Sequence, residues 1–321
     1  MIRWTRWLAA LGATAVLAAC GGSDDPPPNT VADEASARGF NALVAAAGKA
    51  GLVSALDDPA ASLTVFAPTD AAFGNLARSL GFADANAMVQ ALDSATLAKI
   101  LQYHVLPARK PAAALASGSG SEGTLYSFEG KAASLKLSTA GGVKITDAAL
   151  TQATVTAADV QTDNGVIHAV DKVLVPPGVL SVVQMAQVNP TFSVLVEAVV
   201  TAKLAGTLSG TGPFTVFAPT DTAFGAALTE LGLTKPQLLA SPDLGAILTY
   251  HVVAGNVRAA NVVALPKPAA VTTVQGGSFS VGADLGLTDA LGRTATLVAT
   301  DVVASNGVIH VIDKVILPAA P

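Results

Sequence analysis

Cysteine is almost absent from this chain, since Cys20 is the single thiol among 321 residues. One thiol cannot form an internal disulfide, so packing and hydrogen bonds must stabilise the fold. Aromatic residues make up 5% of the sequence and charged residues 13%, whereas apolar residues make up 51%. This apolar composition excludes intrinsic disorder for most of the chain and supplies enough material for sizeable cores.

Metal-binding and catalytic motifs are also missing. The four histidines stand far apart, and no HxH, HExxH or CxxC spacing occurs, which argues against a metal site. No GxSxG string is present to carry a serine nucleophile. A GxGxxG match at residues 118–123 lies in a Ser/Gly-rich loop, without the strand and helix that nucleotide binding requires. We therefore expect no metal, no cofactor and no enzymatic activity.

Basic residues are fewer than acidic residues, 18 against 23. Loss of Arg3 and Arg6 with an amino-terminal leader would leave 16 basic residues and a net charge of about −7. Such a chain lacks the basic surface that nucleic acid or another polyanion requires, so we exclude these partners.

Residues 1–19 have the pattern of an export signal. Arg3 and Arg6 precede a run of small apolar residues that is shorter than the ~20 residues of a membrane-spanning helix. The string LAAC, which ends at Cys20, resembles a bacterial lipobox. This resemblance implies removal of the leader and acylation of Cys20. The alternative is an ordinary signal peptide with a cysteine there by chance.

Residues 20–30 are polar and contain three consecutive prolines, which favour an extended and stiff conformation. We interpret them as a tether that holds the first folded residue away from the lipid headgroups. Gly21, in place of aspartate after the cysteine, resembles lipoproteins sent to the outer membrane. We therefore expect an exported protein, held at the periplasmic or surface face of the outer membrane by acyl chains on Cys20.

Three strings occur twice in the same order, which indicates a duplication. They are TVFAPTDAAF and TVFAPTDTAF (64–73 and 215–224), LQYHVLP and LTYHVVA (101–107 and 248–254), and NGVIHAVDKVLVP and NGVIHVIDKVILP (164–176 and 306–318). The copies lie 151, 147 and 142 residues apart, far beyond the period of stacked repeats, which is ~20–50 residues. We expect two whole domains, 31–177 and 178–321, each of which folds by itself.

These strings resemble the signatures of the fasciclin domain, found here twice. The resemblance implies an α+β fold for each domain, a β-wedge or sandwich of about seven strands flanked by N-terminal helices. It also implies a role in adhesion, which in animal members involves integrins and the region around the Tyr-His motif. No RGD string is present, so the expected partner is a protein or polysaccharide at the cell surface.

The apolar periodicity predicts helices first and strands later in each domain, which also indicates an α+β fold. In the first domain the predicted helices are 35–50, 70–80, 86–92 and 96–104, and the predicted strands are 124–128, 133–138, 143–146, 153–160 and 166–175. Asn164-Gly165 and Asn306-Gly307 are typical of hairpin turns. The closing strand is apolar on both faces, so both should be covered.

Each domain has two histidines at equivalent positions, His104 and His168 in the first copy and His251 and His310 in the second. The first of each pair continues the apolar stripe of a helix, and the second lies in the closing strand. We interpret all four as core residues with hydrogen-bond partners. Tyr103 and Tyr250 lie about 100° around the helix from their histidines, so we expect them to be partly exposed. The candidate interaction residues are these two Tyr-His pairs.

The other residues of the repeated strings are interpreted as structural. They are Thr64, Pro68, Asp70, Asn164, His168 and Asp171, with Thr215, Pro219, Asp221, Asn306, His310 and Asp313 in the second copy. The prolines should end a strand, and Asp70 and Asp221 should cap the helix that follows. Asp171 and Asp313 belong to the apolar closing strand, so each needs a partner if buried.

Our interpretation of the sequence is a membrane-anchored, non-enzymatic adhesion or interaction module. The rival hypotheses are a periplasmic binding protein for a small ligand or polysaccharide, and an unrecognised enzyme. A ligand-binding protein should show an enclosed apolar cleft with polar groups directed into it. An enzyme should show a cluster of perturbed titratable groups in such a cleft.

Overall fold

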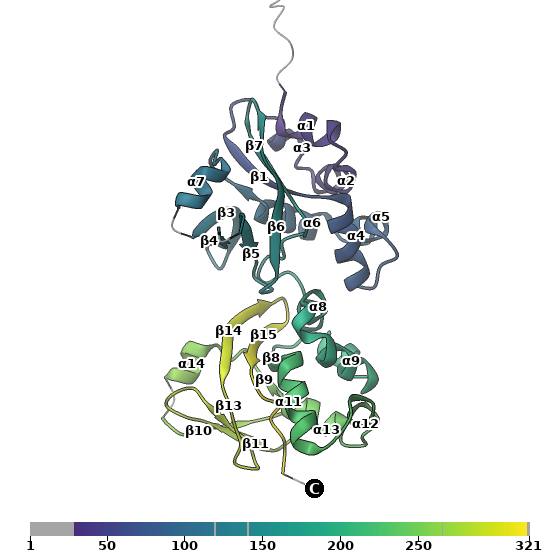
Figure 1. Ribbon diagram of the computed structural model, residues 1–321, viewed down its shortest axis with the longest axis vertical. Helices are drawn as coiled ribbons and strands as arrows, with labels where there is room; N and C mark the ends of the chain where they lie inside the picture. Colours follow the sequence, from purple (N-terminus) through teal and green to yellow (C-terminus); the bar gives the residue numbers. More distant parts are fainter. Residues whose placement is uncertain (1–28, 119, 140, 265, 320–321) are drawn as a thin grey trace, which may run out of the picture.

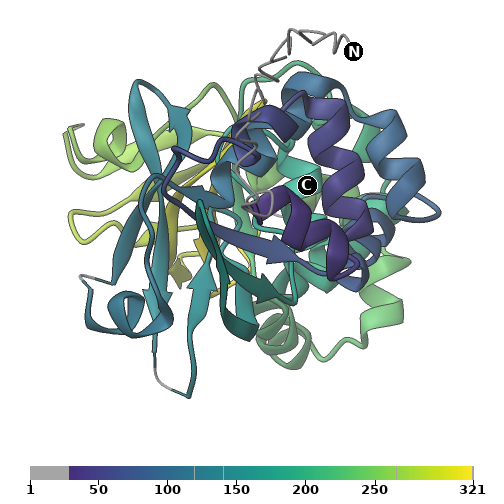
Figure 2. The ribbon, with the colours of Figure 1, turned by 90° about the horizontal axis from the view of Figure 1, so that it is seen from above.

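The computed structural model describes residues 29–319 except 119, 140 and 265. The expected leader 1–19, Cys20 and nearly all of the tether lie outside the described residues. The described chain forms two lobes stacked end to end, with its first and last residues at opposite ends (Figure 1). Seen along the long axis, most helices of both lobes lie on one side and most strands on the other (Figure 2). This arrangement agrees with two tandem α+β domains.

The first domain contains seven helices and seven strands among its described residues. The helices are α1 (Val31–Ala37), α2 (Asn41–Ala50), α3 (Val53–Leu56), α4 (Asp70–Ser79), α5 (Ala85–Ala91), α6 (Ser94–Tyr103) and α7 (Ala112–Ser117). The strands are β1 (Leu63–Pro68), β2 (Val105–Leu106), β3 (Ser121–Phe128), β4 (Lys131–Ser138), β5 (Lys144–Thr146), β6 (Gln152–Thr162) and β7 (Gly165–Val170). They form one sheet in the order β2-β1-β7-β6-β5-β4-β3, which confirms the predicted number.

The second domain repeats this plan with shorter outer strands. Its helices are α8 (Val182–Val188), η1 (Pro190–Phe192), α9 (Ser193–Thr201), α10 (Ala205–Leu208), α11 (Asp221–Leu231), α12 (Lys235–Leu239), α13 (Leu244–Tyr250) and α14 (Ala259–Val263). Its strands are β8 (Phe214–Pro219), β9 (Val252–Ala254), β10 (Ala269–Thr272), β11 (Ser278–Val281), β12 (Leu287–Thr288), β13 (Thr294–Ala295), β14 (Leu297–Ala304) and β15 (Gly307–Ile312). They divide into two four-stranded sheets, β10-β11-β12-β13 and β14-β15-β8-β9. No helix in the described ranges is long and apolar enough to cross a membrane.

A parallel pair of strands, β1 and β7, lies at the centre of the first domain. Leu63 lies opposite Gly165, and Pro68 lies opposite Val170. Every residue of both strands is buried, which confirms that both faces of the closing strand are covered. A Cβ atom at Gly165 would lie 2.6 Å from the carbonyl oxygen of Leu63. This position therefore requires glycine. The second domain repeats the parallel pairing with β8 and β15.

Two predicted boundaries were wrong, one for a local reason and one because of a partner distant in sequence. The predicted helix 35–50 is two helices, separated at Gly39, whose φ of 77° is left-handed. The predicted strand 166–175 ends at Val170, and the next residue, Asp171, is exposed and accepts a hydrogen bond from Thr154 N (2.7 Å).

The predicted Asn-Gly hairpin turns are shifted by one residue. The hairpin between β6 and β7 exists, but its two turn residues are Asp163 and Asn164. Gly165 is instead the first residue of β7 and pairs with Thr162. Gly165 lies in the strand and not in the turn because only a residue without a Cβ atom fits against Leu63 of β1.

The two domains contact each other through side chains. The side-chain amide of Asn189 in the second domain donates to Ala149 O of the first (2.8 Å). An ion pair joins Arg258 of the second domain to Glu129 of the first (2.6 Å). Ala149 also packs with the main core of the second domain. The domains are therefore packed together, although each has a core of its own.

We predict that residues 179–321, expressed alone, unfold in one cooperative transition, because both sheets and nearly all of the core of the second domain lie within this segment. Loss of the contacts to Ala149 and Glu129 should lower its melting temperature relative to the same domain in the full chain. Circular dichroism melts and urea titrations measure both quantities. A broad, non-cooperative transition would mean that the interface is integral to the fold.

Candidate functional site

The Tyr-His motif lies where α6 ends and β2 begins. Leu97, Ile100 and Leu101 form the buried stripe of α6, and Tyr103 is its last residue. His104 is the C-cap of the helix and is buried, which confirms the core interpretation. Its carbonyl accepts a hydrogen bond from Phe66 N of β1 (2.9 Å). The motif thus joins the helical layer to the central strands.

Both ring nitrogens of His104 have partners. Nδ1 donates to Ile100 O (2.7 Å), and Nε2 accepts from Leu174 N (2.8 Å). These bonds fix a neutral ring with its proton on Nδ1. Burial lowers the pKa of His104 to about 4. The second domain repeats the bonds (2.8 and 3.1 Å) and the pKa of about 4 with His251, Ile247 and Ile316.

The closing-strand histidine is held in the other tautomer. His168 Nε2 donates to Lys110 O (2.9 Å), and Nδ1 accepts from Asp159 N (3.2 Å). Its ring lies 5.7 Å from that of Phe66. The second domain repeats these contacts with His310, Val257, Asp301 and Phe217. The imidazoles therefore act as cross-links, and no group of three or more potential metal ligands occurs in the part of the chain that the structure describes.

The prediction that the tyrosines are partly exposed was wrong. Tyr103 is 1% exposed and Tyr250 is 0% exposed. Tyr103 Oη donates to Ser134 O (3.1 Å), and Tyr250 Oη donates to Ser278 O (2.7 Å). The reason is that the β3-β4 hairpin, or β10-β11 in the second domain, covers the flank of the helix. None of the four candidate interaction residues, which include His104 and His251, reaches solvent, so they form no interaction surface in this fold.

Asp70 and Asp221 cap helices, but not the helices that follow them. Thr69 is the N-cap of α4, and its hydroxyl accepts from Ala72 N (3.2 Å). Asp70 accepts from Ala42 N (2.8 Å) and from the side chain of Asn41 (2.9 Å), so it caps α2. The second domain repeats this with Asp221, which accepts from Val194 N and Ser193 Oγ of α9. Each carboxylate therefore braces one helix against another.

Asn164 and Thr64 connect loops to the central strands. Asn164 Oδ1 accepts from Val31 N (2.9 Å), and its amide donates to Leu56 O (2.7 Å). Thr64 Oγ1 donates to Ala108 O (2.6 Å) and accepts from Lys110 N. Asn306 and Thr215 make the same bonds in the second domain.

The remaining structural residues lie at strand ends. Pro68 and Pro219 are the last residues of β1 and β8, as predicted. Asp171 and Asp313 are exposed, so the partner that each would need if it were buried is not required. Asp313 accepts from Thr296 N (2.6 Å), as Asp171 does from its own partner.

Sequence reasoning missed a buried carboxylate that clasps the end of each domain. Asp147 accepts from the backbone N–H groups of Ala149, Thr151 and Val175, and burial raises its pKa to about 6. In the second domain Asp289 accepts from Leu317 N and pairs with Arg293 (2.7 Å). Burial acts to raise the pKa of Asp289, but these bonds hold it below its usual value. A Thr-Asp-Ala string repeated in both copies was the available signal.

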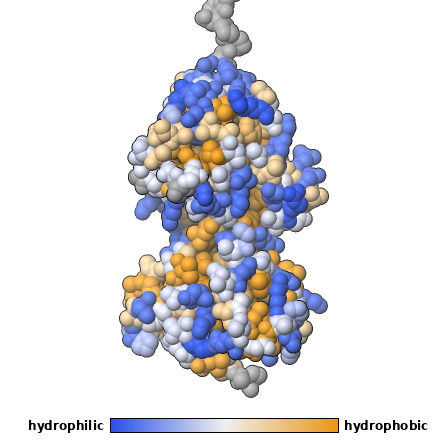
Figure 3. All heavy atoms as spheres, in the orientation of Figure 1, coloured by the Kyte–Doolittle hydropathy of each residue, from blue (hydrophilic) through white to orange (hydrophobic). Residues whose placement is uncertain are grey.

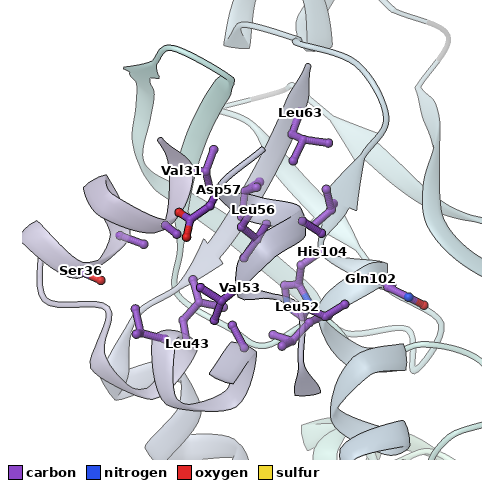
Figure 4. A pocket seen from close by; sticks show the side chains of 18 of the residues that line it. Val31, Ser36, Leu43, Leu52, Val53, Leu56, Asp57, Leu63, Gln102 and His104 are labelled. Carbon is purple, nitrogen blue, oxygen red and sulfur yellow. The ribbon is translucent and has the colours of Figure 1, made fainter. Parts of the chain in front are cut away.

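An apolar pocket of about 330 Å³ lies in the first domain between α1, α2, α3 and the start of β2. Figure 4 shows its lining side chains gathered around a common space, with His104 among them. A pocket of about 40 Å³ lies at the equivalent place in the second domain, next to His251. The first pocket is lined mainly by aliphatic residues, among them Val31, Leu43, Val44, Ala47, Leu56 and Val65.

The "Fasciclin domain" family profile matches residues 38–176 and 190–318, well over half of the chain. The chain belongs to the fasciclin family. Protein sll1483 of Synechocystis is 44% identical over 146 residues, 43% of this chain and 74% of that protein. Transforming growth factor-beta-induced protein ig-h3 of Sus scrofa is 32% identical over 156 residues, 49% of this chain and 22% of that protein.

Among solved structures, the fasciclin domain pair of the insect cell adhesion molecule Fasciclin I covers 89% of this chain and 98% of its own. The TM-score is 0.46 at 20% sequence identity.

We predict that His104→Ala and His251→Ala each destabilise their fasciclin domain by about 2–4 kcal/mol, because each change leaves a cavity and unpaired backbone groups. Tyr103→Phe and Tyr250→Phe are the matched controls, since each keeps the buried ring; the first loses one hydrogen bond and the second loses two, at about 1 kcal/mol each. Urea denaturation of the four variants measures the differences. Wild-type stability in the histidine variants would contradict the core role.

We also predict that acid destabilises the second domain more than the first. The folded-state pKa of about 4 for His104 and His251 lies below 6.5, so both domains lose stability as pH falls from 6.5 towards 4. The lowered pKa of His310 adds to this loss in the second domain. The raised pKa of Asp147 opposes it in the first domain, because below pH 6 the folded carboxyl retains a proton that the unfolded chain releases.

Hydrogen exchange of backbone amides at pH 7, 5.5 and 4.5 measures this difference within the full chain. Protection in β8 and β15 should fall more steeply with acid than protection in β1 and β7. Equal losses of amide protection in the two domains would contradict the stabilising effect of Asp147 in acid.

Proposed function

We propose that this protein is an exported, lipid-anchored and non-enzymatic adhesion or interaction module made of two fasciclin domains. Domains of this family are typically adhesion or interaction modules. The observation that carries the proposal is that the buried polar side chains of the repeated motifs all find partners inside the described structure. The motif histidines in particular use both ring nitrogens. The motifs therefore maintain the fold, and binding is left to the exposed surface.

Exposed apolar side chains support an interaction surface on the second domain. Figure 3 shows apolar residues at several places on one face of this domain. Val263 is 59% exposed and Val298 is 63% exposed, the two highest values among the large apolar residues that the structure describes. Contiguous exposed apolar patches mark surfaces that contact other molecules, and we propose that these two side chains belong to such a patch. The proposed partner is a protein or polysaccharide at the cell surface.

The proposed anchor is an acyl group on Cys20, and the tether connects this residue to the first domain. The ten residues from Gly21 to Thr30 can span at most ~36 Å when fully extended. The first helix, α1, begins at Val31, so the first domain would lie next to the membrane and the second domain farther out. The proposed location is the outer membrane, at its periplasmic or surface face.

We predict that cells lacking the gene attach to surfaces and aggregate less than wild-type cells, and that the intact gene restores both. Cys20→Ser should release the protein from the membrane fraction and fail to restore attachment. Val263→Ser with Val298→Ser should keep the melting temperature, because exposed positions contribute little to stability, and should weaken attachment. Leu150→Ser, at an exposed apolar position of the first domain, is the matched control.

Microscopy of surface-bound cells and fractionation after a high-salt wash provide the readouts. Normal attachment of the deletion strain would overturn the adhesion proposal. Retention of the Cys20→Ser protein in the washed membrane would overturn the lipid anchor alone.

A further inference from the structure

We infer that the pocket of the first domain binds the hydrocarbon chain of a small amphiphile whose head group is uncharged or cationic. The inference goes beyond the proposed adhesive function, and neither depends on the other. It rests on the size of the pocket, its lining, the charges at its mouth and its contrast with the second domain.

The size of the pocket suits a medium-length chain. Its volume of about 330 Å³ lies within the usual range for small-molecule sites, roughly 300–1,000 Å³. An apolar protein cavity of about 150 Å³ accommodates benzene. Twice that volume corresponds to a hydrocarbon of about ten to twelve carbons by the same scale.

The lining selects an aliphatic occupant. The pocket residues include valines, leucines and alanines but no phenylalanine, tyrosine or tryptophan. His104 is the most buried polar residue of the lining, and both of its ring nitrogens are bonded to the backbone. Because the inner wall offers no free hydrogen-bonding group, a polar molecule would lose its hydration there without replacement. The enclosed part of the ligand must therefore be hydrocarbon.

The mouth of the pocket carries negative charge. Asp33 and Asp57 line the pocket, and each lies 2.8 Å from the hydroxyl of Thr30. No lysine or arginine is among the lining residues. Leu125 is 45% exposed and Val53 is 38% exposed, and both also line the pocket. A head group at this place meets two acidic side chains, which disfavours an anionic amphiphile and favours a cationic one.

The second domain shows that the pocket is not an unavoidable feature of the fold. Ala32 and Ala47 line the larger pocket, and the residues at the equivalent positions are Val183 and Val199. The larger valine side chains occupy part of the same space, where about 40 Å³ remains. The surrounding frame is shared, since Val31 and Val182 make the same bond to the motif asparagine. Small side chains therefore open the site in the first domain alone.

The test uses the full chain with Cys20→Ser, so that no acyl group of its own competes for the pocket. Isothermal titration with decyltrimethylammonium, below its micelle concentration, should show one site per chain. Ala32→Val with Ala47→Val should weaken binding at least tenfold. Ala45→Val is the matched control, because Ala45 is exposed on the same helix and does not line the pocket. Circular dichroism melts verify that each variant is folded.

Two further measurements separate the parts of the inference. Decanoate, with a ten-carbon chain and a negative head group, should bind several-fold more weakly than decyltrimethylammonium. Asp57→Asn should reduce this difference in affinity between the two probes. Val183→Ala with Val199→Ala should add a second site in the other domain. Unchanged binding by a folded Ala32→Val, Ala47→Val chain would overturn the site. Equal binding of the two probes would overturn the head-group assignment.

Discussion

The parallel pairing of β1 with β7 is the constraint on which the rest of each domain depends. The two strands are about one hundred residues apart in sequence, and neither has a polar face to leave in water. Helices must therefore cover one side and the outer strands the other. Glycine at position 165 lets the two backbones meet, and Asn164 beside it attaches α1 to the same point. The second domain repeats the arrangement around Gly307 and Asn306.

The two domains share the same internal hydrogen bonds, but they differ in the size of the pocket that each one contains. The histidines, threonines and asparagines of the motifs have the same partners in both domains. The carboxylates that clasp the domain ends differ, since Asp289 has Arg293 beside it whereas Asp147 has Thr151 at the equivalent place. The pockets differ more, because two alanines in one copy are valines in the other. The duplicated domains therefore share the hydrogen bonds of the motifs and differ in the volume of the side chains that line the pocket.

Local patterns in the sequence predicted what depends on neighbouring residues. The apolar stripe of α6 correctly predicted the burial of His104, and α4 ends at Ser79, one residue before the predicted end, with Gly81 at a φ of 84° just beyond it. Most of the failures involve partners distant in sequence, whereas the break in the predicted helix 35–50 is local and lies at Gly39. Tyr103 is covered by residues about thirty positions later, and Asp70 caps a helix that begins 29 residues earlier. The pocket could not be predicted, because its lining comes from several helices and strands whose common space only the fold defines.

The chain enters and leaves the first domain at opposite ends of β7. At the entrance Asn29 O accepts from Asp163 N, and Val31 is bonded to Asn164, just before the strand begins. At the exit Asp147 holds Val175, a few residues after the strand ends. A pulling force between an anchored amino end and a partner bound to the second domain would therefore run along the strand. It would load the β1–β7 hydrogen bonds together in shear, so that this domain resists tension as a unit and does not peel open bond by bond.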